Sequence, residues 1–314
     1  MHFFSKHAKA ITVFLTVASL ALTGCARGDG ENDSAESSPV SRVASLGLGD
    51  ADTLLALGIT PVAIAPWGAE GDGSESGVGP WSEDLLGDAK PEKIFNTASG
   101  FTVDILEKVT ATNPTQIIAV NQAVDAQAKA SLDKIASTTV KPEGYQDWQI
   151  PWDKQVETIS QAVGKEEEGD RLIKETEEKF AQFKKDHPEL QGKRAAIVMP
   201  YEGKIGLYTD GDGRGQFIRD LGFTNPKELQ GDGSSFFVDY APENYAKLNN
   251  VDYLFVLDYN GALNALKKDA TFQKLDVVKD GRVRYLETDV GNAMSMPNPV
   301  TIPWVIDKFA EQLK

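Results

Sequence analysis

The sequence predicts an α/β protein with two lobes and a long connecting helix. Strand-like and helix-like segments alternate along most of the chain, as is typical of α/β folds. A helix-compatible stretch, residues 152–187, separates two such halves. The chain has 314 residues, and a single hydrophobic core usually stops growing at roughly 250–300 residues. Length and pattern together favour two lobes.

The first half begins with alternating short elements. Asp50 can cap the first helix and Gly58 can end it, while Thr102 can cap a later one. Residues 66–101 are rich in Gly and Pro and carry no regular pattern. The expected strands are 42–47, 61–65, 115–121 and a short one from 138, and the expected helices are 50–58, 102–113 and 125–136.

The middle of the chain predicts the connecting helix. One helical segment closes at Gly164, and the next has apolar residues at helical spacing with charge elsewhere, until Pro188 stops it. This length and position predict a spine between the lobes. The second half then predicts strands at 194–200, 205–210, 253–259 and 283–287, with helices between them, including one at 214–221, and at the end.

The two halves also resemble each other. "DADTLLALGITP" and "RGQFIRDLGFTNP" both end in Leu-Gly-apolar-Thr and reach a proline. In "LEKVTATNPTQIIAV" and "PENYAKLNNVDYLFVL" a glutamate in a short helix precedes a strand by about ten residues. We interpret this as two versions of one lobe rather than a short-period repeat.

The N-terminus has the pattern of an export signal. Lys6 and Lys9 precede the uninterrupted apolar or small run 11–22, which is too short to span a bilayer. The run ends in Leu-Thr-Gly-Cys, which resembles the lipobox of bacterial lipoproteins. In that family the cysteine is linked to diacylglycerol and the peptide is cut just before it. The resemblance therefore predicts a signal peptide at 1–24 and lipidation of Cys25.

The segment that follows Cys25 is polar and has no apolar periodicity. Residues 25–40 are rich in Gly, Ser, Asp and Glu, which favours a flexible tether. The chain has 32 Lys and Arg against 47 Asp and Glu. Loss of Lys6 and Lys9 with the signal leaves a formal charge of −17. Such an acidic chain is not expected to bind nucleic acid.

Residues 40–314 resemble the substrate-binding lipoproteins of bacterial importers for ferric siderophores and cobalamin. The resemblance lies in the order of several segments: "RVASLGLGDADTLLALGITPVAI", "LEKVTATNPTQIIA", "PWDKQVETISQAVGKEEEGDRLIKETEEKF", "FQKLDVVKDGRVRYLE" and "MSMPNPVTIPWVIDKF". Gln116 stands where the family usually has Asp. The segments "PWGAEGDGSESGVGPW" and "GLYTDGDGRGQF" resemble the ferric-siderophore branch.

This resemblance implies a fold and a partner. The fold is two Rossmann-like lobes joined by one long helix, as in class III periplasmic binding proteins: an N-terminal lobe at 41–164, a spine helix at 165–188 and a C-terminal lobe at 189–314. The ligand is expected in the cleft between the lobes, with little hinge closure. Glu107 and Glu243 match the exposed glutamate that each lobe of the family docks onto arginines of the permease, and complementary charge of this kind fixes orientation.

Aromatic side chains in loops are the main ligand candidates, because flat rings suit large, partly apolar chelates. Trp67 and Trp81 lie in the Gly- and Pro-rich stretch, and Trp148 in "EGYQDWQIPW". Met296, in a loop expected to face the cleft, is an adaptable apolar contact or a plug. Trp152 and Trp304 are expected to pack. The remaining candidates are Tyr208 and Arg214, the latter at a helix start where it could meet an anionic chelate.

The sequence does not favour a metal site, a dinucleotide site or a hydrolase site. His187 is the one histidine left after cleavage, so a transition metal held by imidazoles is not expected. The stretch 209–215 does not complete a calcium loop, because Arg214 and Leu221 occupy ligand positions. Asp52 stands where a dinucleotide fingerprint needs glycine. No nucleophile elbow or usable cysteine supports a hydrolase.

The sequence therefore predicts a monomeric binding protein without a cofactor. It would be lipid-anchored on the outer face of the cell membrane, capture a ferric siderophore and deliver it to an ABC permease and its ATPase. Haem and cobalamin are alternative ligands of the same fold. Haem would need an axial Tyr or Met, because histidine is nearly absent.

Overall fold

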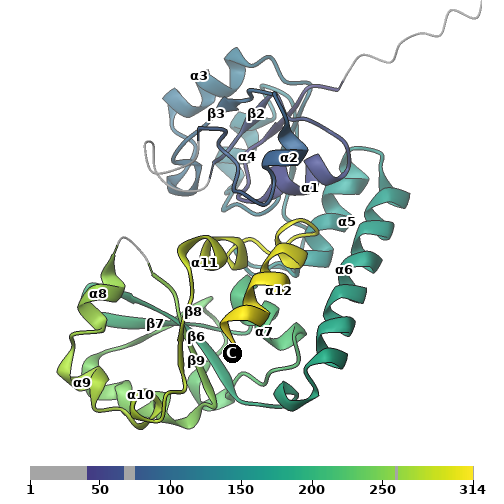
Figure 1. Cartoon of the computed structure of the whole chain (residues 1–314). Helices are drawn as coiled ribbons and strands as arrows, with labels where there is room; N and C mark the ends of the chain where they lie inside the picture. Colours follow the sequence, from purple (N-terminus) through teal and green to yellow (C-terminus); the bar gives the residue numbers. More distant parts are fainter. Residues whose placement is uncertain (1–40, 67–74, 259–260, 314) are drawn as a thin grey trace, which may run out of the picture. The chain divides into compact units, whose positions relative to one another are not determined.

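The computed structural model describes residues 41–66, 75–258 and 261–313, which belong to one compact unit. Two five-stranded sheets form its framework, in the orders β3-β2-β1-β4-β5 and β10-β9-β6-β7-β8. Helices surround both sheets (Figure 1). The two α/β lobes predicted from the sequence are confirmed.

The first sheet is parallel throughout, as a βαβ succession requires. Val43, Ile117 and Ile118 on its central strands are fully buried, because parallel sheets are covered on both faces. Its elements are β1 (Val43–Ser45), α1 (Asp50–Ala56), β2 (Ala63–Ile64), α2 (Glu83–Leu86), β3 (Glu92–Lys93), η1 (Thr97–Ser99), α3 (Val103–Ala111), β4 (Gln116–Ala119), α4 (Ala126–Leu132) and β5 (Ser137–Val140).

The sequence-based elements of this lobe are found, with three additions and one changed cap. The additions are α2, β3 and η1. Strand β3 lies inside the Gly- and Pro-rich stretch, where two residues give no periodic signal. Thr102 caps α3 by accepting from the N–H of Ile105, as predicted. Asp50 does not cap α1: it is the first helical residue, and Gly49 is the N-cap.

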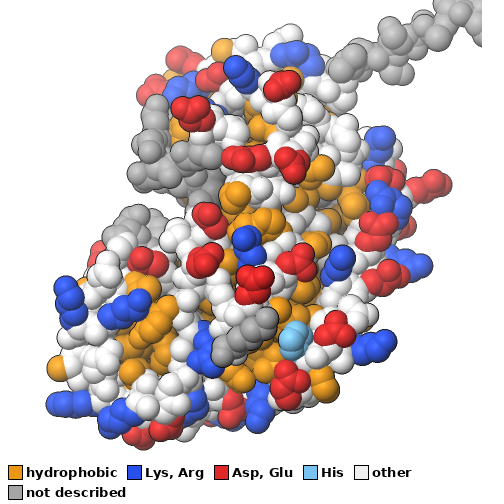
Figure 2. Space-filling view, in the orientation of Figure 1, with side chains coloured by type: hydrophobic (Ala, Val, Ile, Leu, Met, Phe, Trp, Pro, Cys, Tyr) orange, Lys and Arg blue, Asp and Glu red, His pale blue; other side chains and the backbone are white. Residues whose placement is uncertain are grey.

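The connection between the lobes consists of α5 (Trp152–Ala162) and the 21-residue α6 (Glu166–Asp186). Buried Phe180 and Phe183 lie on the inner side of α6, and charged side chains of both signs lie along its outer side (Figure 2). Gly169 lets the two helices approach closely, since a Cβ there would lie 2.3 Å from the Ser160 hydroxyl oxygen. The predicted spine, with its break near Gly164, is confirmed.

The second sheet is mixed. Strand β7 pairs antiparallel with β6 and with β8. The β6–β7 pair is a hairpin, because only Glu202 and Gly203 connect the two strands. Its elements are η2 (Pro188–Leu190), β6 (Ala195–Tyr201), β7 (Lys204–Tyr208), α7 (Gly213–Asp220), η3 (Lys227–Leu229), β8 (Phe237–Tyr240), η4 (Pro242–Asn250), β9 (Tyr253–Val256), α8 (Ala262–Leu266), α9 (Ala270–Gln273), α10 (Asp276–Lys279), β10 (Val283–Tyr285), α11 (Thr288–Met294) and α12 (Thr301–Gln312).

This sheet corrects two expectations. The sequence analysis missed β8, which follows a Gly- and Ser-rich turn. The apparent correspondence between the strand before α1 and the strand before α7 does not extend to topology. β1 is a central parallel strand, whereas β7 belongs to a hairpin. The second predicted correspondence holds locally, because Glu107 in α3 precedes β4 and Glu243 in η4 precedes β9.

Candidate functional site

Two buried aspartates organise the start of α1. Asp50 is 1% exposed and accepts hydrogen bonds from the backbone N–H groups of Val120 (2.7 Å) and Asn121 (3.2 Å). Burial raises the pKa of Asp50 to about 7, although these two donors oppose the rise. The carboxylate therefore ties the turn after β1 to the end of β4.

Asp52 connects the two lobes. It accepts from the Trp81 indole N–H (3.0 Å), the Ser82 hydroxyl (2.5 Å) and the Asn298 amide (3.2 Å). Asn298 follows α11 in the second lobe, and Asp52 is only 4% exposed. Burial raises the pKa of Asp52, and the three donors oppose that rise. A buried carboxylate is stable only with such donors, so this cluster fixes the junction of the lobes.

Met296 and Trp81 are part of the same junction. Gly49 has φ +81°, and a Cβ there would lie 2.8 Å from Cβ of Met296. Met296 is 4% exposed, and the segment 292–299, expected to be a loop, begins within α11. The Trp81 ring, 9% exposed, meets Trp304 of α12 edge-to-face at 5.6 Å between centroids. In this arrangement Trp81 and Met296 serve packing, and the ligand role predicted for them is untested.

Arg214 and Tyr208, two of the predicted ligand residues, are in contact. The Arg214 guanidinium carbon lies 3.9 Å from the centroid of the Tyr208 ring. Nη1 of Arg214 donates to both carboxylate oxygens of Asp212, at 2.9 and 2.8 Å. Asp212 also caps α7 by accepting from the Arg214 N–H. Burial raises the pKa of Asp212, and the guanidinium opposes the rise.

The loop between β7 and α7 reaches the other lobe. A Cβ on Gly211 would lie 2.4 Å from Oε1 of Gln149, the neighbour of Trp148. Within the second lobe, a Cβ on Gly213 would lie 2.6 Å from Cδ of Pro297. Trp148 is partly exposed and has the left-handed φ of 66°, which is rare for a bulky residue. The structure thus brings the segment after Trp148 against the loop that runs from Tyr208 to the start of α7.

The sequence analysis missed an apolar surface beside this region. Tyr201 and Phe237 pack over Gly206, where a Cβ would lie 3.1 Å from the Tyr201 ring. Phe236 and Phe237 are in contact at 4.7 Å between centroids, and the Tyr208 hydroxyl donates to Sδ of Met199 (3.4 Å). These four side chains, Met199, Tyr201, Phe236 and Phe237, are partly exposed. We call these four side chains the aromatic surface. The sequence signal that could have revealed it is the pair Phe236-Phe237 directly after a Gly-rich turn.

The two docking candidates are both exposed. Glu107 lies on α3 and Glu243 near the start of η4, one in each lobe. The two other candidates, Cys25 and Trp67, lie outside the described residues.

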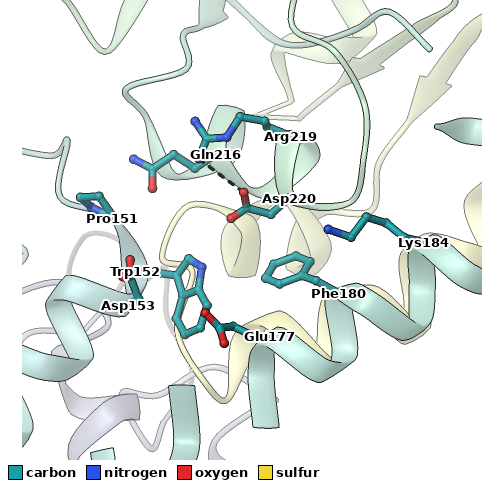
Figure 3. A pocket seen from close by; sticks show the side chains of 9 residues that line it. All are labelled: Pro151, Trp152, Asp153, Glu177, Phe180, Lys184, Gln216, Arg219 and Asp220. Atoms are coloured by element: carbon teal, nitrogen blue, oxygen red, sulfur yellow. Dashed lines mark hydrogen bonds and ion pairs between the residues drawn. The ribbon is translucent and has the colours of Figure 1, made fainter. Parts of the chain in front are cut away.

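A hollow of about 450 Å³ lies where α5, α6 and α7 meet (Figure 3). Trp152 and Phe180 line it, and charged groups of both signs surround them, including Lys184, Arg219 and Asp220. None of the predicted ligand residues lines it, so we place the candidate site at the junction instead. Within the described ranges no cluster of three or more His, Cys, Asp or Glu could hold a metal, and no helix is long and apolar enough to cross a membrane.

Comparison with known proteins decides the family. The model of the family described as "Periplasmic binding protein" matches residues 43–290. The chain belongs to this family. A curated relative is the Fe(3+)-citrate-binding protein YfmC of Bacillus subtilis (strain 168), 23% identical over 313 residues and 92% of each chain.

Solved structures agree with this membership. PiaA of Streptococcus pneumoniae TIGR4 in complex with ferrichrome is similar, with a TM-score of 0.73 and 28% identity over 87% of this chain and 92% of that one. A periplasmic solute binding protein of Mycobacterium smegmatis str. MC2 155 has a TM-score of 0.75, also at 28% identity, over 87% and 91%. These findings confirm the predicted resemblance and the fold. Members of this family bind substrates for transport, so the chain is a binding protein, not an enzyme, and iron chelates are ligands of such proteins rather than cofactors.

Proposed function

We propose that this protein captures a ferric siderophore between its lobes and delivers it to the permease of an ABC importer. The observation that carries the proposal is the pair of Tyr208 and Arg214 beside the aromatic surface, in a chain similar to a ferrichrome-bound protein. The segment after Trp148 packs against the same loop. Aromatic rings give an apolar face to an organic chelate, and the guanidinium supplies directional donors.

The test is a fluorescence titration of the chain from residue 25 onward. A ferric siderophore should quench tryptophan emission saturably, and the iron-free chelator should bind more weakly. Arg214→Ala should weaken binding, whereas Lys184→Ala in the hollow of Figure 3 is the matched control and should not. The proposal fails if haem or cobalamin binds tightly and no ferric chelate does.

Tyr201 is a poor candidate for the axial ligand that haem would need. Burial, with the hydrogen bond to Asp239, raises the pKa of Tyr201 to about 12. The raised pKa disfavours the phenolate form that an axial tyrosine ligand needs.

The proposal includes a lipid anchor at Cys25 and delivery by docking at Glu107 and Glu243. Cys25→Ser should release the protein from the membrane fraction. Replacing Glu107 and Glu243 together by Ala should abolish uptake and leave ligand affinity unchanged. Glu83→Ala with Glu311→Ala makes the same charge change at other exposed positions and should leave uptake intact. A loss of ligand affinity in the Glu107 and Glu243 variant would place these residues in the ligand site.

A further inference from the structure

Basic side chains near the candidate site are matched by carboxylates. Lys141, which follows β5, pairs with Asp147 at 2.8 Å, one residue before Trp148. Lys204 lies 3.5 Å from Asp239, which also accepts from the Tyr201 hydroxyl of the aromatic surface. Each of these pairs carries no net charge.

Arg214 is neutralised most completely. Its side chain is 12% exposed and that of Asp212 is 6% exposed. Breaking such a buried pair by drawing the guanidinium to another anion would leave Asp212 charged and without its partner, which is strongly unfavourable. Arg214 therefore adds no net positive charge for an incoming ligand.

The same arginine retains a free donor. Nε of Arg214 is buried and has no hydrogen-bond partner among the described residues. An unpaired buried donor costs free energy until an acceptor arrives.

One further lysine and two exposed glutamates also affect the net charge that a ligand would meet. Lys93, at the end of the outer strand β3, donates to the backbone carbonyl of Glu75 (3.0 Å) and has no carboxylate partner within the described ranges. Glu143 and Glu202 add exposed carboxylates near Lys141 and Lys204 in the chain. Placing an anionic chelate against these groups and the aromatic surface would cost desolvation without compensating charge.

We infer that the site selects ferric chelates without net negative charge, such as ferric trihydroxamates, over anionic tricatecholates and citrates. Three singly charged hydroxamates neutralise Fe³⁺, whereas three catecholates leave the complex strongly anionic. The hydroxamate complex also presents an organic shell to the aromatic surface. This inference rests on the proposed function.

The experiment compares ferrichrome, a ferric tricatecholate and ferric citrate by fluorescence titration at low and high salt. Ferrichrome should bind at least about a hundredfold more tightly than either anionic complex, and its affinity should barely depend on salt. Tighter binding of an anionic complex, with affinity that falls steeply with salt, would overturn the inference. Failure of all three to bind would refute the proposed function itself.

A variant tests the charge argument directly. Asp212→Asn keeps a good helix cap but frees the charge of Arg214. It should improve affinity for the tricatecholate by about tenfold or more and leave ferrichrome affinity nearly unchanged. Asp147→Asn, which frees Lys141, is a second variant in case the first does not fold. If Asp212 and Asp147 had only a structural role, each variant would bind the tricatecholate and ferrichrome more weakly. That result in the two variants would contradict the inference.

Discussion

The close approach of Gly49 to Met296 at the lobe junction predicts a specific loss of stability. At Gly49 a new Cβ would meet Cβ of Met296 at 2.8 Å, and Met296 cannot move its Cβ without moving its backbone. The left-handed φ of +81° adds strain of about 1–2 kcal/mol for an L-residue. Overpacking adds about 1–3 kcal/mol. Gly49→Ala should therefore lower the free energy of unfolding by about 2–5 kcal/mol.

Gly58 offers a matched control. Its φ of +76° is nearly the same, but nothing lies within 4 Å of a Cβ placed there. Gly58→Ala should therefore lose only the strain, about 1–2 kcal/mol. Urea denaturation of both variants measures the difference, which is the contribution of the contact between lobes. Equal losses in the two variants would refute the claim that residue 49 presses against the second lobe.

Further predictions concern the buried carboxylates. Because the folded pKa of Asp50 is raised from 3.8 to about 7, the folded state holds a proton that the unfolded state has lost between these values. The free energy of unfolding should thus fall as pH rises from about 5 to 7, by at most about 1.4 kcal/mol per pH unit. Asp50→Asn should flatten this slope, and an unchanged slope in the variant would contradict the raised pKa of Asp50. Asp52→Asn and Asn298→Ala should show a coupling of about 1–3 kcal/mol in a double-mutant cycle, and strict additivity would mean that this hydrogen bond does not join the lobes. Trp81→Phe, which keeps a ring but removes the N–H donor to Asp52, should cost about 1–3 kcal/mol in chemical denaturation, and a neutral result would show that water replaces the donor.

Much of the fold could be predicted from local patterns. Thr102 caps α3 because a hydroxyl can accept from a backbone N–H at a helix start, and Pro188 ends the spine because proline lacks a donor. Strands β3 and β8 escaped because short strands next to Gly-rich turns lack the periodicity on which such a prediction depends. Strand β7 was predicted at 205–210, but its antiparallel pairing was not, because the pattern of apolar residues marks a strand without giving the direction of its partners.

The sequence by itself determined the lobes, the spine and the kind of binding protein, since these follow from local periodicity and the order of segments. Tertiary structure alone decided which polar groups meet. Asp52 and Asn298 are 246 residues apart in the chain, and no local pattern reports such a contact. Likewise, Arg214 looked in the sequence like a free cation for an anionic ligand. Burial beside Asp212 makes it one half of a neutral pair, because a charge removed from water must be matched by another close by.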